Sequence, residues 1–180
     1  MDLFIRGVRR LSFACGLFAA ALIVAAVVIV CQMVFIRYVL NDNTIWQTDF
    51  VTYSLVAATF IGGPYVLMTK GHVNVDVVPI YVGQNSRWWL ALIAIVVSLG
   101  FALAMTWLSF QFWHESFENN WRSDTMWRAR LWIPYAAMPF GLGVLSLQYI
   151  VDLICLVTGR EYPFGMSPDQ AGPSLTEAGI

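Results

Sequence analysis

The fold is decided by a run of 26 residues without a charged side chain, LSFACGLFAAALIVAAVVIVCQMVFI, at positions 11–36. A helix of that length, at about 1.5 Å per residue, exceeds the ~30 Å hydrocarbon core of a bilayer. A secretory signal peptide carries an apolar region of only roughly 7–15 residues. We therefore interpret the run as an uncleaved first membrane span.

Three further uncharged runs follow, at residues 50–69, 88–113 and 131–151. The whole chain is 59% hydrophobic and 12% charged, whereas soluble domains average about 45–50% and about 25%. We predict an all-α integral membrane protein with four transmembrane helices in one domain, residues 1–158. Residues 159–180 are rich in Gly, Pro and Ser, and we expect them to form a disordered cytoplasmic tail.

Arginines set the predicted orientation, because Arg6, Arg9 and Arg10 precede the first span. The positive-inside rule places this end in the cytoplasm, and four spans return the C-terminus to the same side. Residues 70–87 then form a short segment along the cytoplasmic interface between the second and third spans. His72 and Asp76 lie four residues apart there, and we expect a local structural contact because two ligands do not make a metal site.

Several function classes are disfavoured by what the sequence lacks. The net charge of −1 comes without the basic stripe that nucleic-acid binding needs. Two histidines in separate loops and three scattered cysteines give no pair for a haem or a redox disulfide. No span carries a charged residue near its centre, which disfavours a self-sufficient ion-coupled transporter. We expect no catalytic residue, cofactor or metal ion in this chain.

Two alternatives stay open at this stage. One is a membrane-anchor subunit of a quinone-linked or haem-linked redox complex, and the other is a small homo-oligomeric channel. The small residues at helical spacing in the first two spans, Gly16 with Ala20 and Ala58 with Gly62, fit internal packing and packing against a partner equally well.

Candidate partner-contact residues lie in the loops predicted on the outer face. Asp49 stands at the start of the second span, where the helix dipole favours a carboxylate. It either marks the end of the span or forms a salt bridge with a partner or with Arg37. The loop after the third span carries three arginines that Glu115, Glu118 and Asp124 offset, and such a charged loop suits a soluble partner. The full set is Arg37, Trp46, Asp49, Arg122, Trp127, Arg128 and Arg130. Pro134 and Pro139 open the fourth span, and we expect a kink there.

Four pieces of sequence, in order, resemble the small membrane subunit of tripartite ATP-independent periplasmic (TRAP) transporters, the DctQ-like family. They are Phe35-Ile36-Arg37-Tyr38-Val39-Leu40-Asn41, then Trp46 with a nearby acidic position, then Gly71-His72-Val73 with Asp76, and finally Trp132-Ile133-Pro134-Tyr135 with Pro139 and Gly141. The resemblance covers nearly all of residues 1–158. One departure is that family members commonly have glutamates just after the tryptophan, whereas this chain has Gln47, Thr48 and Asp49.

The resemblance implies a division of labour in the bacterial inner membrane. A large polytopic subunit carries the substrate and sodium sites, a periplasmic substrate-binding protein captures an organic acid, and the small subunit braces the large one. On this reading Arg122, Arg128 and Arg130 help to receive the binding protein. Arg37, Trp46 and Asp49 would support the same outer junction.

Overall fold

A computed structural model describes residues 2–69 and 84–158 of the chain. Their elements are α1 (Asp2–Val39), α2 (Gln47–Met68), α4 (Gln84–Glu118), α5 (Trp132–Tyr135) and α6 (Ala137–Val157). Four helical segments are long and apolar enough to cross a membrane, and the described residues contain no strand. The predicted all-α fold with four spanning helices is confirmed. His72, Asp76, the proposed interfacial segment up to residue 83 and the tail at 159–180 lie outside the described residues.

The helices are longer than the uncharged runs that predicted them. α1 has 38 residues and includes all three N-terminal arginines, and its length of ~57 Å exceeds the bilayer core. Its first turns are held in place because Ile5 and Val8 are buried against Val151 and Cys155 of α6. α4 has 35 residues and ends only at Glu118.

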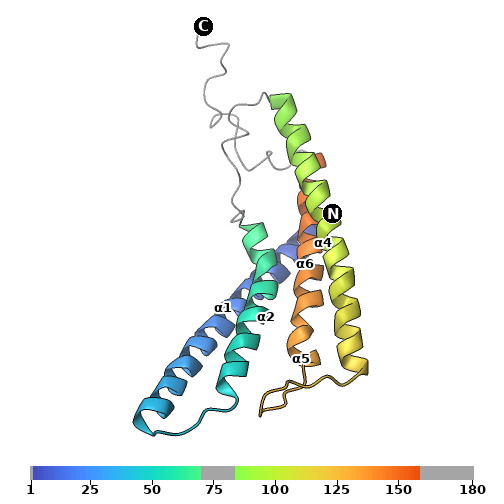
Figure 1. Cartoon of the computed structure of the whole chain (residues 1–180). Helices are drawn as coiled ribbons and strands as arrows, with labels where there is room; N and C mark the ends of the chain where they lie inside the picture. Colours follow the sequence, from blue (N-terminus) through green and yellow to red (C-terminus); the bar gives the residue numbers. More distant parts are fainter. Residues whose placement is uncertain (1, 70–83, 159–180) are drawn as a thin grey trace, which may run out of the picture.

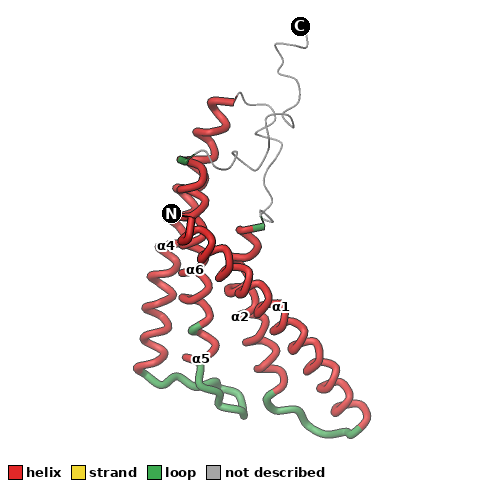
Figure 2. Tube along the Cα trace, turned by 180° about the vertical axis from the view of Figure 1, so that it is seen from behind, coloured by secondary structure: helices red, strands yellow, loops and turns green. Residues whose placement is uncertain are grey.

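The helices form a fan with α6 at its centre (Figure 1). α2 packs against both α1 and α6, α4 packs against α6, and the first turns of α1 also cross α6. In the most apolar 18-residue stretch of each span, 39% of the residues of α5–α6 are buried but only 11% of those of α4. This difference is expected because α6 is central and α4 lies at the edge. The helices spread apart toward the connections 40–46 and 119–131 (Figure 2), and we call this part the two-loop end.

The contact between α2 and α6, which we call the seam, depends on one proline and one glycine. Pro64 is fully buried inside α2, and because proline has no N–H, the carbonyl of Phe60 lacks its helical partner. Gly141 of α6 packs directly on that carbonyl. A Cβ atom at position 141 would lie 2.3 Å from the Phe60 oxygen, so the two backbones meet only because glycine has no side chain.

Small residues also mediate the packing of α1 on α2. A Cβ at Gly16 would lie 2.4 Å from Cγ of Tyr65, and one at Gly62 would lie 3.3 Å from Cβ of Ala19. Ala58 is buried, whereas Ala20 is exposed. Three of these four small residues thus serve internal packing, and Ala20 faces outward.

A buried polar network joins α1 to α6. The hydroxyl of Ser12 donates to Oε1 of Gln148 at 3.1 Å, and Nε2 of Gln148 donates to Oδ1 of Asp152 at 3.1 Å. Ser12 and Gln148 are 0% and 1% exposed. Since an unsatisfied polar group is costly away from water, this network fixes the register of α1 on α6.

The fourth span is interrupted between the two prolines noted in the sequence. α5 contains Pro134, Ala136 separates it from α6, and Pro139 lies in the first turn of α6. Pro139 cannot donate to the carbonyl of Tyr135, so the i+4 ladder lacks a bond at this point. α5 follows directly on the connection 119–131 and contacts α2 and α4 as well as α6.

Candidate partner-docking site

The two-loop end carries a short hairpin at residues 121–131. Ser123 N–H donates to the carbonyl of Ala129 at 2.9 Å, and Leu131 N–H donates to that of Trp121 at 3.0 Å. Arg122 and Arg130 form an isolated antiparallel bridge between these bonds. The hairpin therefore has a defined backbone although it contains no regular strand.

The tip of the hairpin is fastened to the start of α2. The hydroxyl of Thr125 donates to Oδ2 of Asp49 and also bonds the Ser123 hydroxyl at 2.9 Å. The indole of Trp127 lies 6.5 Å, centroid to centroid, from that of Trp46. Trp46, Asp49 and Trp127, which the sequence singled out separately, thus belong to one contact.

The base of the hairpin is fastened to α4 by aromatic side chains. Nε1 of Trp113 donates to the carbonyl of Trp132 at 3.1 Å. Phe117 makes an edge contact with Trp132, and Phe112 makes one with Trp121, with centroid distances of 5.6 and 5.7 Å. The hairpin consequently spans from α2 to α4 across the two-loop end.

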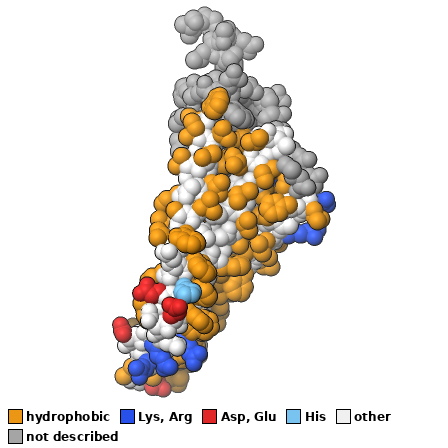
Figure 3. All heavy atoms as spheres, turned by 90° about the vertical axis from the view of Figure 1, so that its right-hand side faces the viewer, with side chains coloured by type: hydrophobic (Ala, Val, Ile, Leu, Met, Phe, Trp, Pro, Cys, Tyr) orange, Lys and Arg blue, Asp and Glu red, His pale blue; other side chains and the backbone are white. Residues whose placement is uncertain are grey.

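Three exposed arginines are presented by this hairpin: Arg122, Arg128 and Arg130. None forms an ion pair with a carboxylate of residues 2–69 or 84–158, so the expected offset by Glu115, Glu118 and Asp124 does not take the form of direct contacts. Glu118 instead lies 3.7 Å from Nδ1 of His114, an ion pair only when the histidine is protonated. Figure 3 shows basic side chains gathered at the tip of the two-loop end, with acidic side chains near them.

The hairpin holds these arginines at some energetic cost, through charge repulsion at two of them and backbone strain at the third. Arg122 and Arg130 stand opposite each other in the bridge, and like charges directly across a strand pair are destabilising. Arg128 has a φ of 47°, in the left-handed region that non-glycine residues seldom adopt. A concentration of cations at an exposed, fastened turn is suited to binding a surface that carries carboxylates.

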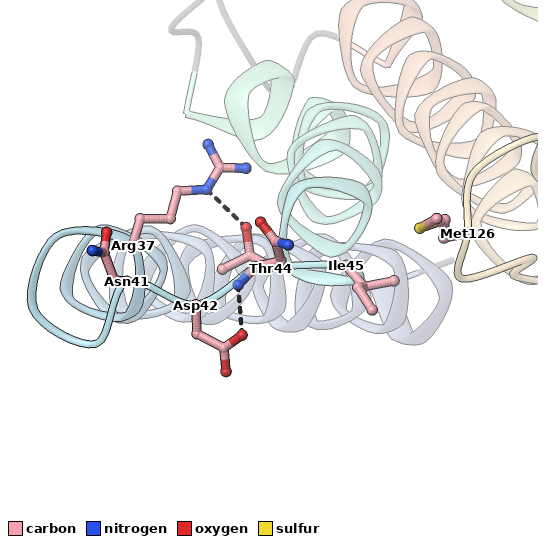
Figure 4. A pocket seen from close by; sticks show the side chains of 7 residues that line it. Arg37, Asn41, Asp42, Thr44, Ile45 and Met126 are labelled. Atoms are coloured by element: carbon pink, nitrogen blue, oxygen red, sulfur yellow. Dashed lines mark hydrogen bonds between the residues drawn. The ribbon is translucent and has the colours of Figure 1, made fainter.

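Arg37 lies apart from the hairpin contacts. Its Nε donates to the hydroxyl of Thr44 at 2.9 Å, so within the described residues Arg37 and Asp49 have separate partners and do not pair with each other. Arg37 lines a hollow of about 560 Å³ with Asn41, Asp42, Asn43, Thr44, Ile45 and Met126 (Figure 4).

Sequence reasoning did not identify Thr125, Phe112 or Phe117 as part of the site. Thr125 lies 76 residues from Asp49, and nothing in the local sequence signals that contact. The aromatic pairs had a weak signal, since Phe110, Phe112, Trp113 and Phe117 cluster at the end of α4. In the described part of the chain no three His, Cys, Asp or Glu side chains are grouped as a metal site would require.

Comparison with known proteins connects this architecture to a family. The family model for the DctQ component of tripartite ATP-independent periplasmic transporters matches residues 26–159, which include α2, the hairpin and α6. The C4-dicarboxylate TRAP transporter small permease protein DctQ of Vibrio cholerae serotype O1 is 23% identical over 148 residues. That alignment covers 71% of this chain and 64% of the relative, so the chain spans less than two thirds of the relative's length.

These matches confirm the resemblance found in the sequence, and they favour transport over a redox anchor. The chain therefore belongs to the DctQ component family of tripartite ATP-independent periplasmic transporters, as a transport component rather than an enzyme and as a multi-pass protein of the bacterial inner membrane.

Proposed function

We propose that this chain is the scaffold subunit of a secondary TRAP transporter. It braces the large substrate-translocating subunit and helps to dock the periplasmic substrate-binding protein during sodium-coupled uptake of an organic acid. Both termini lie in the cytoplasm and the two-loop end faces the periplasm. The observation that carries the docking role is the fastened hairpin with three exposed arginines that lack ion-pair partners among the described residues.

The bracing role is supported by the openness of the fan. A compact four-helix bundle buries one face of every helix, but α4 here contacts α6 and leaves large apolar side chains exposed along its length, including Val97, Phe101 and Trp107 at 65% each. Such a surface faces lipid or a partner's helices, and in lipid helix association depends on close packing. A large polytopic subunit is the partner that this family membership implies.

The proposed orientation rests on the first helix. Arg6, Arg9 and Arg10 lie at the end of α1 remote from the hairpin, and positive residues beside the first span favour the cytoplasmic side. A cysteine introduced by Asp124→Cys should react with a membrane-impermeant maleimide in intact cells. Labelling that requires cell lysis would reverse the orientation and remove the docking role.

The cargo follows from the relative more than from this chain. The Vibrio cholerae protein is named for C4-dicarboxylates, so four-carbon dicarboxylates are the first organic acids to test. Reconstituted vesicles containing both membrane subunits and the binding protein should accumulate labelled dicarboxylate only with an inward sodium gradient.

The bracing role is tested by co-purification in mild detergent through a tag on this chain, expressed with its native operon. Recovery of a large polytopic subunit at equal stoichiometry is expected. Recovery of this chain alone, folded and monodisperse, would contradict the brace and favour the homo-oligomeric channel.

The docking role is tested by reversing the charge of the hairpin with Arg122→Glu, Arg128→Glu and Arg130→Glu together. We expect uptake at limiting binding protein to fall by about tenfold or more, because complementary charges mainly accelerate association. The matched control replaces the same residues with lysine, which keeps the charge and should keep most of the uptake.

The salt dependence of binding-protein association is a second test of the docking role. Added salt should slow association of the binding protein with the native transporter and have little effect on the charge-reversed one, because screening acts on exposed charges. Equal uptake by native and charge-reversed transporters, with equal amounts of assembled complex in the membrane, would exclude the arginines from docking.

A further inference from the structure

The hollow beside Arg37 lies at the level where apolar helices give way to polar loops. α1 ends at Val39, two residues after Arg37, and α2 begins at Gln47. Tyr38 and Trp46 are the sequence neighbours of the lining residues Arg37 and Ile45. Both are exposed, and aromatic residues are enriched at membrane interfaces. The hollow is therefore at the depth of lipid headgroups, whichever side of the membrane the two-loop end occupies.

Opposite charges line this hollow without pairing. The Arg37 guanidinium uses its Nε for Thr44, at 2.9 Å, and its two terminal nitrogens have no partner among the described residues. Asp42 accepts one bond from the backbone N–H of Asn43 at 2.7 Å. The two charged groups do not meet each other, and Figure 4 shows them on different sides of the loop. Each group lines the hollow and retains unused hydrogen-bonding capacity.

The remaining lining is partly apolar. Ile45 is 52% exposed and Met126, from the tip of the hairpin, is 87% exposed. Water does not favour so exposed a methionine, but its flexible thioether adapts well to an irregular apolar ligand. The hollow thus offers a cation, an anion and an apolar edge, and its ~560 Å³ falls in the usual range for small-molecule sites.

We propose that the hollow binds phosphatidylethanolamine through its zwitterionic headgroup. The phosphate accepts hydrogen bonds from the Arg37 guanidinium, and the primary ammonium donates to the Asp42 carboxylate. Ile45 and Met126 contact the glycerol backbone and the first methylenes of the acyl chains. A lipid held in this way touches both the loop at 41–45 and the hairpin.

Other headgroups match the lining less well. An anionic phosphoglycerol headgroup would satisfy Arg37 but place no cation beside Asp42, whose charge would repel it. A phosphocholine headgroup has both charges, but its quaternary ammonium has no N–H to donate. The ethanolamine headgroup satisfies both side chains with charge-assisted hydrogen bonds.

Native mass spectrometry of the full chain, purified with whatever subunit accompanies it, tests the assignment. Delipidated protein is titrated separately with phosphatidylethanolamine, phosphatidylglycerol and phosphatidylcholine of equal chain length. We expect phosphatidylethanolamine to bind about tenfold more tightly than the other two, the effect of one charge-assisted hydrogen bond.

Two variants locate the site. Arg37→Gln and Asp42→Asn should each weaken phosphatidylethanolamine binding by about tenfold, and Asp42→Asn keeps an acceptor for the Asn43 N–H so that the loop is retained. Matched controls are Arg10→Gln at the other end of α1 and Asp124→Asn in the hairpin, which should bind like the native chain. Circular dichroism confirms that the helices are unchanged.

A soluble competitor separates the lipid from a free zwitterion. O-phosphoethanolamine carries the same charges without acyl chains and should compete only at much higher concentration. If it binds as tightly as the lipid, the site belongs to a soluble ligand and the lipid assignment is wrong. The assignment also fails if all three lipids bind equally, if neither variant weakens binding, or if only Arg37→Gln does so, which would indicate a simple anion site.

Discussion

The seam between α2 and α6 and the hairpin at residues 121–131 both join distant parts of the chain, but by opposite means. At the seam, Gly141 meets the Phe60 carbonyl where no methyl group would fit. At the hairpin, a threonine hydroxyl bonds the Asp49 carboxylate, and two partly exposed indoles pack together. The seam thus depends on the lack of a side chain at Gly141, which lets two backbones meet. The candidate docking site instead depends on a few specific side-chain contacts.

The largest effect is expected where one atom is added to the seam. Gly141→Ala should lower the free energy of unfolding by about 3 kcal/mol, because the new methyl meets a backbone carbonyl that cannot move aside. Unfolding in mixed detergent micelles measures the loss. Gly143→Ala is the matched control, since its Cβ would lie 3.9 Å from Thr106, an ordinary contact. Equal stability of the two variants would contradict the close approach at Gly141.

A smaller loss is expected at the contact of α1 with α2. Gly16→Ala places its methyl against the Tyr65 ring, and we expect a cost of about 2 kcal/mol because a side chain shifts more readily than a backbone. Gly7→Ala, with no neighbouring atom within 4 Å, should instead gain a little stability from its higher helix propensity. The same micelle unfolding experiment compares them, and a stable Gly16→Ala variant would show that α1 is free to move.

Loss of the hydrogen bond between Thr125 and Asp49 should loosen the hairpin without destabilising the helices. Asp49→Ala and Thr125→Val each remove one end of the same hydrogen bond, so their effects should overlap, with a coupling of about 1 kcal/mol. Hydrogen exchange of the amides at 121–131 should accelerate while the stability of the helices stays the same. Asp124→Ala, an exposed neighbour, is the control. Additive effects of the two variants would show that the bond is not formed.

The smallest effect is expected at the base of the hairpin. Trp113→Phe keeps an aromatic ring but removes the Nε1 donor to Trp132 and reduces the indole to a phenyl ring. The lost hydrogen bond accounts for roughly 0.5–1 kcal/mol of the expected cost. Trp107→Phe removes the same donor from an exposed position on α4 and should leave stability unchanged. Thermal unfolding of the two variants in detergent provides the comparison. Identical midpoints would show that the bond from Trp113 to Trp132 does not contribute to stability.

The four spanning helices could be predicted from the sequence because a long run without charged residues indicates a segment surrounded by lipid and not by water. Their ends could not be predicted from the same signal. α1 begins nine residues before its apolar run, since Ile5 and Val8 find buried partners on α6. Tertiary packing brings these residues together, and the arginine-rich sequence around Ile5 and Val8 gave no indication of it.

The candidate site shows the same limit. Several of its members stand out in the sequence as polar or aromatic residues near span ends: Trp46, Asp49 and the three arginines. Their assembly depends on Thr125, an ordinary loop residue whose role appears only when the chain is folded. At the seam, Pro64 within an apolar run was an available signal of a carbonyl in need of a close neighbour, but nothing in the sequence indicated that Gly141 would supply it.

The spreading of the helices toward the two-loop end has a consequence for the surrounding lipid. A protein whose cross-section is larger at one end displaces more lipid from one leaflet than from the other. The difference in displaced area acts like a wedge and favours a curved bilayer around the isolated chain. If a partner subunit fills the wide side of the fan, as the proposed scaffold role requires, it would cancel this wedge, and relief of bilayer curvature stress would add to the direct contacts between the subunits.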